Sequence, residues 1–184
     1  AFAGFLAAAA FLLPLALFLV RQDFGRLGSP FEIYRADEFL DDARHVDSLS
    51  AFLAGYVERM PTLSLHGGHF PPGHAVFLVA VGRAFGFGTL PAGIAVLACF
   101  AIGILVCWSA IRERCPGRAG RQAALLLLAC PSMLDFACTS MDAVFLLFAA
   151  LALRAGLRAF ETGASVRRAI GAGVLIGLRL PGWR

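Results

Sequence analysis

Residues 84–111 contain no charged side chain in 28 consecutive positions, and this run constrains the fold more than any other feature. About 20 apolar residues in a helix cross the hydrocarbon core of a bilayer, so we predict a membrane span at 89–111. Residues 1–20 are also uncharged, and as a helix they would be roughly 30 Å long. Pro14 lies within them, which a membrane helix tolerates. A signal peptide is the alternative, but its apolar region would be shorter and followed by a small-residue cleavage site.

Three further apolar runs follow the second span. Residues 122–141 are apolar except for Gln122 and Asp135, residues 143–153 form the next run, and residues 169–178 begin a last one. Hydrophobic residues make up 59% of the chain, far more than in a soluble domain. The sequence therefore predicts an all-α fold, a polytopic integral membrane bundle of about five transmembrane helices. The five cysteines form no C-x-x-C pair and are interpreted as small buried hydrophobic residues.

Every cation in the chain is an arginine, and the arginines stand at the ends of the apolar runs. The net charge of +4 could indicate nucleic-acid binding, but this placement is typical of membrane topology, so we exclude nucleic acid as a partner. Two basic segments are separated by two predicted spans and therefore lie on one side of the membrane. The positive-inside rule makes that side cytoplasmic. Their arginines are Arg112, Arg114, Arg118 and Arg121, and Arg154, Arg158, Arg167 and Arg168.

The positions of the other loops follow from this orientation. The junction at 139–142 then lies outside. Residues 70–87 have a short apolar core that Arg83 interrupts; if they do not span, residues 21–88 form one external loop, whereas a span there would exchange the two sides. We favour the first arrangement. It makes residues 1–184 a single transmembrane domain, with the first membrane helix at 1–20, the external acidic loop at 21–88 and further membrane helices at 89–184.

The predicted external loop holds most of the polar chemistry of the chain. Residues 21–74 contain all four histidines, both tyrosines and eight of the twelve acids: Asp23, Glu32, Asp37, Glu38, Asp41, Asp42, Asp47 and Glu58. Between Ile33 and Val57 the apolar residues are spaced more like an amphipathic helix than a strand, which predicts one or two juxtamembrane helices on the membrane surface. A membrane protein that keeps most of its acids in one loop is expected to do its chemistry there.

Short motifs occur in a distinctive order along the chain. The loop contains Asp-Glu-Phe-Leu-Asp-Asp at 37–42 and His-Phe-Pro-Pro-Gly at 69–73, and Pro-Ser-Met-Leu-Asp-Phe-Ala-Cys-Thr-Ser-Met-Asp-Ala-Val-Phe follows at 131–145. In this order the sequence resembles the N-terminal part of the GT-C glycosyltransferases, which include protein O-mannosyltransferases and lipid A aminoarabinose transferases. The resemblance implies transfer of a sugar from a polyprenyl-phosphate donor, on the outer face, to a hydroxyl of a lipid, polysaccharide or protein. Because that family has many more spans, we expect this chain to be an N-terminal fragment that is inactive alone.

The resemblance also implies which acids carry the reaction. The family has an Asp or Asp-Glu in its first external loop and a second Asp opening the helix after the next external turn, which correspond here to Asp37, Glu38 and Asp142. The acceptor hydroxyl must lose a proton as it attacks the anomeric carbon, and a nearby carboxylate can be the base. Asp37 is the first choice. Asp42 is the rival, because i, i+4 spacing puts it on one helix face with Glu38. For each loop acid the alternative is a solvated surface charge.

Asp142 also has a purely structural interpretation. Thr139 or Ser140 would cap the following helix, and an acid in the first turn interacts favourably with the helix dipole. Asp135 lies near the outer end of the preceding run. Acids at membrane depth are costly and often functional, but the start of an outer loop would explain this one as well.

The leaving lipid phosphate requires cations or N–H donors. The loop offers three candidates, among which the sequence does not choose: His69, Arg35 and Arg44. The Pro-Pro motif of the family falls on Pro71, Pro72 and Gly73. This tripeptide predicts a rigid turn, which would hold the rim of the loop over the site.

The histidines also raise the question of a metal. His66, His69 and His74 could gather with an acid into a zinc or manganese site, but their spacing matches no standard zinc signature. We therefore expect a turn with exposed histidines, and neither a metal nor another cofactor, with a divalent metal as the alternative.

Two other classes of function stay open. A transporter fragment would carry charged or discontinuous helices at mid-membrane, whereas the long runs here are nearly uncharged. A non-catalytic membrane anchor or assembly subunit would have the same helices, with the acids serving solubility. Our expectation is a multi-pass glycosyltransferase of the bacterial cytoplasmic membrane, whose partners are the bilayer, a polyprenyl-phosphate-linked sugar and an acceptor.

Overall fold

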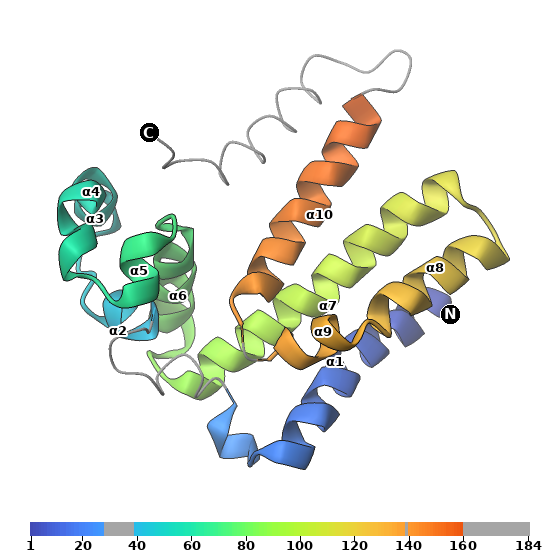
Figure 1. Cartoon of the computed structure of the whole chain (residues 1–184), viewed down its shortest axis with the longest axis horizontal. Helices are drawn as coiled ribbons and strands as arrows, with labels where there is room; N and C mark the ends of the chain where they lie inside the picture. Colours follow the sequence, from blue (N-terminus) through green and yellow to red (C-terminus); the bar gives the residue numbers. More distant parts are fainter. Residues whose placement is uncertain (28–38, 139, 160–184) are drawn as a thin grey trace. The chain divides into compact units, whose positions relative to one another are not determined.

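The computed structural model describes residues 1–27, 39–138 and 140–159, and every regular element in these ranges is helical, which confirms the all-α prediction. The described residues divide into two compact units (Figure 1). Unit 1 comprises Ala1–Arg21 and the described residues from Val96 onward, and unit 2 comprises those between Gln22 and Ala95. The elements are α1 (Phe2–Arg21), η1 (Phe24–Arg26), α2 (Phe39–Arg44), α3 (Leu49–Ala54), α4 (Tyr56–Arg59), η3 (Met60–Thr62), α5 (Leu65–His69), α6 (Gly73–Phe85), α7 (Thr89–Arg114), α8 (Arg118–Leu128), α9 (Pro131–Phe136) and α10 (Asp142–Ala159).

Within unit 1, α7 and α10 run in the same direction. Gly103 of α7 packs against α10 so closely that a Cβ added to it would lie 3.2 Å from the backbone nitrogen of Leu147. Small residues at such positions let two helix backbones approach. Towards the C-terminal ends, the Glu113 carboxylate pairs with Arg154 at 3.1 Å and with Arg158 at 2.6 Å. The return between the parallel helices is made by α8 and α9 (Figure 1).

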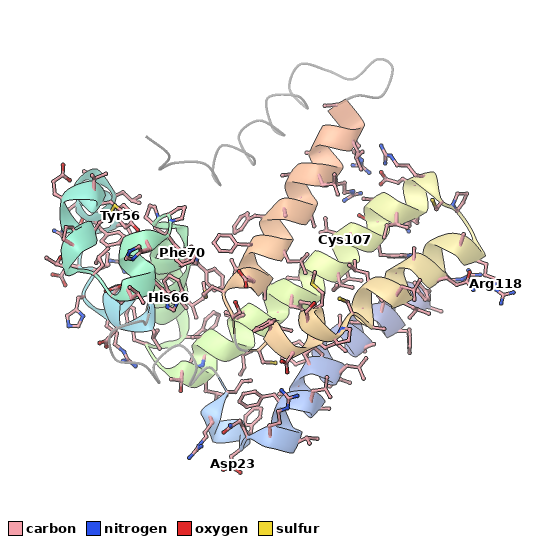
Figure 2. The ribbon with its side chains drawn as sticks, viewed as in Figure 1. Asp23, Tyr56, His66, Phe70, Cys107 and Arg118 are labelled. Carbon is pink, nitrogen blue, oxygen red and sulfur yellow. The ribbon has the colours of Figure 1, made fainter. Side chains whose placement is uncertain are left out.

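The two ends of unit 1 differ in charge. One end gathers the arginines of α7, α8 and α10: Arg112, Arg114, Arg118, Arg121, Arg154 and Arg158. The start of α1 lies at this end too, because the Phe2 and Trp108 rings are 5.5 Å apart between centroids, and Figure 2 labels Arg118 there. At the opposite end Arg21 pairs with Asp135 of α9, and Asp142 begins α10. Unit 1 therefore separates its described basic segments from Asp142.

Two described helices are long and apolar enough to cross a membrane, α1 and α7. The run predicted to span at 122–141 is divided, since α8 ends at Leu128 and α9 begins at Pro131. Proline lacks an N–H and disfavours helical backbone in the residue before it, and Cys130 is accordingly extended. The run at 169–178 lies outside the described residues, so the number of about five spans stays a prediction. Of the cysteines, Cys138 is buried, Cys99, Cys107 and Cys130 are half-buried, and Cys115, which follows the charged end of α7 and lies outside the apolar runs, is exposed.

Unit 2 is built around a parallel pair of helices, α2 and α6. The first residue of α2, Phe39, stacks on His74 near the start of α6, with ring centroids 4.3 Å apart. At the other end each helix supplies an arginine to carbonyls that follow its partner. Arg44 donates to Phe87 O from Nε and Nη2, at 3.3 and 3.1 Å. Arg83 donates to Asp47 O at 2.6 Å. These bonds satisfy carbonyls at the ends of helices.

Helix α6 is short for a membrane span. Its 13 residues give a length of about 20 Å, below the roughly 30 Å of a hydrocarbon core. Leu78 and Val79 are fully buried, and Gly86, with φ of 95°, ends the helix in a conformation that favours glycine. The Arg83 that interrupts the apolar run has a structural role in holding the end of α2. These features favour the arrangement in which residues 70–87 do not cross the membrane.

Candidate functional site

The first-choice catalytic acids, Asp37 and Glu38, lie outside the described residues, as does Arg35. Their roles stay predictions. The described chain resumes at Phe39, immediately after Glu38, and continues into α2, which carries the exposed Asp41 and the half-buried Asp42. Where one or two loop helices were predicted between residues 33 and 57, the structure has three short ones, α2, α3 and α4; their position on the membrane surface stays a prediction.

Asp42 binds one residue, Ser64, with both carboxylate oxygens. The Ser64 backbone N–H donates to Oδ1 at 3.0 Å and lies 3.2 Å from Oδ2, and the Ser64 hydroxyl donates to Oδ2 at 2.5 Å. Ser64 is the N-cap of α5, where its Oγ accepts from Gly67 N at 3.0 Å. The rival base is therefore joined to the start of α5.

Tyr56 approaches the same short helix from α4. Its hydroxyl donates to Gly67 O at 2.5 Å and also contacts Phe70 O. Burial of the phenol, with the charge of Asp42 as the second cause, raises the pKa of Tyr56 above its ordinary value. The side chain is therefore a neutral hydrogen-bond donor at physiological pH.

Four rings gather beside α5 in unit 2: Phe39, His66, Phe70 and His74. Their centroids are separated by 4.3 to 6.1 Å, and Figure 2 labels His66 and Phe70 together with Tyr56. The expectation of exposed histidines is wrong for His74, which is only 3% exposed. Its position in the first turn of α6 turns the ring onto Phe39, and its Nδ1 lies 2.9 Å from Pro71 O.

The other predicted binding residues surround this ring cluster. His69 is exposed at the end of α5, with Nδ1 2.7 Å from Leu65 O. Pro71 and Pro72 link α5 to α6, and Gly73 begins α6 with open space beside its Cα. Arg44 binds Phe87 O, as described above, and pairs with Asp41 at 3.4 Å. His69 and Arg44 are both exposed; the Nδ1–H of His69 is committed to Leu65 O, so its ring would offer a second N–H only as an imidazolium, whereas the Arg44 guanidinium also holds the fold of unit 2.

The geometry gives no support for a metal within the described residues. No group of three or more His, Cys, Asp or Glu side chains in them is placed to hold a metal ion. The carboxylate nearest to α5, Asp42, is engaged with Ser64, and His74 faces Phe39. The metal question stays open for the residues outside the described ranges.

Asp142 stands exposed at the first position of α10 in unit 1. Ser140 Oγ donates to Asp142 Oδ2 at 2.8 Å and lies 3.1 Å from the Asp142 backbone nitrogen. Of the two predicted caps, Thr139 lies outside the described residues. The contacts with Ser140 agree with the structural interpretation of Asp142 and leave its carboxylate open to solvent.

Sequence reasoning missed the importance of Ser64 and Tyr56. Ser64 precedes Leu-His-Gly-Gly-His, and a serine before a short helix is an N-cap signal that could have been used. No local pattern signals the contacts of Tyr56, because its partners lie 11 and 14 residues away.

Comparisons with known proteins extend this picture. The search of curated proteins and the search of solved structures found no match. A family model described as dolichyl-phosphate-mannose-protein mannosyltransferase matches residues 69–180, more than half of the chain. The match includes the Pro71-Pro72-Gly73 turn, α7 and Asp142, but not Asp37 or Asp42. The chain thus belongs to the dolichyl-phosphate-mannose-protein mannosyltransferase family of GT-C membrane glycosyltransferases.

Proposed function

We propose that this chain is part of a multi-pass enzyme of the cytoplasmic membrane that transfers mannose from a polyprenyl-phosphate carrier to a protein hydroxyl on the outer face. The family match over residues 69–180 carries the proposal. The family description names the donor, the sugar and a protein acceptor, and it favours a protein over the lipid and polysaccharide acceptors. The apolar helices α1 and α7 fit an enzyme that uses a lipid-linked donor.

The reaction requires two functions from the protein, a base for the acceptor hydroxyl and donors for the leaving phosphate. The acceptor oxygen forms a bond to the anomeric carbon, the bond from that carbon to the phosphate oxygen breaks, and the polyprenyl phosphate leaves with the electron pair. A carboxylate takes the hydroxyl proton, a role for which Asp37 is our first choice and Glu38 the second. Cationic or N–H donors stabilise the departing phosphate, for which the exposed Arg44 and, as an imidazolium, the exposed His69 are the candidates in the described part of unit 2.

The charge separation in unit 1 supports the orientation of the site. The arginines of α7, α8 and α10 lie at one end, and Arg21, Asp135 and Asp142 lie at the other. By the positive-inside rule the arginine end is cytoplasmic. The chain leaves α1 at the end that carries Asp142, so in this orientation Asp142 and the start of the acidic loop would both lie outside.

Cysteine labelling in intact cells tests this topology. With Cys115 as the sole cysteine, we expect no reaction with a membrane-impermeant maleimide until the membrane is permeabilised, since Cys115 follows α7 at the arginine end. In a cysteine-free background, Ser50→Cys in α3 should react at once, because Ser50 is exposed in the acidic loop. Labelling of Cys115 without permeabilisation would reverse the orientation and remove the proposed outer site.

Substitutions of Asp142 and Ser140 distinguish a catalytic role of Asp142 from a role in helix capping. In the full-length enzyme, Asp142→Asn should lower mannose transfer about 10-fold, the effect of losing roughly 1.4 kcal/mol from a hydrogen bond to a charged group. Ser140→Ala removes the capping hydroxyl but keeps the carboxylate, so it should change turnover less than about twofold. Initial rates with dolichyl-phosphate mannose and an acceptor peptide measure both. Equal losses in the two variants would assign Asp142 to capping.

A further inference from the structure

We infer that Asp42 and Tyr56 are positioning residues that clamp α5 at both ends and so fix the rim from His69 to Gly73. The proposed function gives this rim a role in donor binding, and the inference rests on that function. Within unit 2 the clamp is defined by contacts between α2, α4 and α5 that do not depend on any assignment of activity.

The first half of the clamp acts on the N-terminal end of α5. Asp42 accepts both donors of Ser64, the backbone N–H at 3.0 Å and the hydroxyl at 2.5 Å. The Ser64 oxygen then accepts from Gly67 N at 3.0 Å. The first N–H groups of a helix have no partner within the helix, so this relay satisfies one of them while it joins α5 to α2.

The second half of the clamp acts on carbonyls at the C-terminal end. The Tyr56 hydroxyl contacts Gly67 O and Phe70 O, and Tyr56 is itself only 8% exposed. Phe70 directly precedes Pro71, whose backbone is restricted by its ring. Holding Phe70 O therefore sets the direction in which the rim leaves α5.

Gly67 and Gly68, the two glycines of His-Gly-Gly-His, allow Asp42 and Met60 to lie close to the backbone of α5. A Cβ on Gly67 would overlap Asp42 Oδ2, and a Cβ on Gly68 would lie 2.5 Å from Met60 O. The backbone of α5 thus covers the Oδ2 side of the Asp42 carboxylate, which already receives the Ser64 hydroxyl. Such a carboxylate is suited to holding α5, and the role of base falls to another acid of the loop.

The experiment compares hydroxyl deletions in the full-length enzyme. Tyr56→Phe and Ser64→Ala should each raise the KM for dolichyl-phosphate mannose several-fold while kcat changes less than twofold. Ser64→Thr, which keeps the cap, should restore the wild-type KM. Asp42→Asn combined with Ser64→Ala should be no worse than the stronger single variant, because both remove one contact. Thr62→Ala is the matched control, since its hydroxyl bonds only to Arg59 O among the described contacts of η3.

Hydrogen exchange gives a readout that does not need activity. The amides of Gly67, Gly68 and Phe70 should exchange faster in Tyr56→Phe and Ser64→Ala, with the amides of α6 unchanged. Unchanged exchange at those three amides overturns the clamp, whether or not the enzyme transfers mannose. A wild-type enzyme that transfers no mannose overturns the proposed function, while faster exchange in the variants still supports the clamp. If Asp42→Asn lowers kcat ~10²-fold or more and removes the acidic limb of the pH profile while Ser64→Ala stays normal, Asp42 is the base and the inference is wrong.

Discussion

Replacing Asp37 by Asn in the full-length enzyme is expected to abolish mannose transfer while expression and donor binding remain. Asparagine keeps the shape of the side chain and removes its capacity to take the hydroxyl proton. General-base catalysis is typically worth ~10²–10⁴-fold in rate, so kcat should fall by this factor. Single-turnover transfer from dolichyl-phosphate mannose to an acceptor peptide measures the loss, and a donor-binding titration confirms that the site is intact.

Neighbouring acids in the loop provide controls for Asp37. Asp41→Asn removes a nearby charge that is exposed and paired with Arg44 at 3.4 Å, and it should keep turnover within about twofold. Asp42→Asn should act on the KM for the donor and leave kcat close to wild type. An Asp37→Asn enzyme with turnover within about twofold of wild type would exclude Asp37 as the base, and if Glu38→Gln, Asp142→Asn and Asp42→Asn were also active, the proposed mechanism would have to be abandoned.

Replacing Gly68 by Ala is expected to lower the stability of the protein. Its Cβ would lie 2.5 Å from the backbone oxygen of Met60, and a backbone atom cannot move aside as a flexible side chain can. Inserting a methyl into such a contact typically costs about 1–3 kcal/mol. Thermal unfolding in detergent, followed by near-UV circular dichroism, should show the lower stability.

Gly73→Ala is the matched control, because it adds the same methyl group five residues further along. Nothing lies within 4 Å of a Cβ at Gly73, and Ala favours helical backbone over Gly by roughly 0.5–1 kcal/mol. The unfolding temperature should therefore stay the same or rise slightly. Equal unfolding temperatures for Gly68→Ala and wild type would contradict the close packing of α5 on η3.

The helical class and the helices α1 and α7 could be predicted from the sequence, since a long uncharged run such as 1–20 or 84–111 is a local property. The division of residues 122–141 could also have been predicted, because Pro131 stands where a continuous helix would need an N–H donor. Apolar composition alone gives no sign of such a break, whereas the local backbone effect of a proline does.

The contacts between distant residues within the acidic loop could not be predicted from the sequence in the same way. Asp42 meets Ser64 across 22 positions, and Arg44 meets Phe87 across 43. Such contacts depend on how α2 and α6 pack, and residue spacing carries no signal for them. His74 looks like one more histidine of a turn until the stacking with Phe39 is known. The sequence therefore identifies the candidate acids of the loop but does not show which of them has a catalytic role and which a structural one.

The pairing of Arg21 with Asp135 has a consequence for the order in which the protein folds. The two residues are 114 positions apart, and the contacts of unit 2 described above lie between Phe39 and Phe87. A ribosome that adds about 5–20 residues per second needs roughly 2–10 s to go from Phe87 to Asp135. During that interval the described contacts among α2, α4, α5 and α6 can form, whereas the first helix of unit 1 still lacks α9. These contacts of unit 2 can thus form before the pairing of α1 with α9 in unit 1.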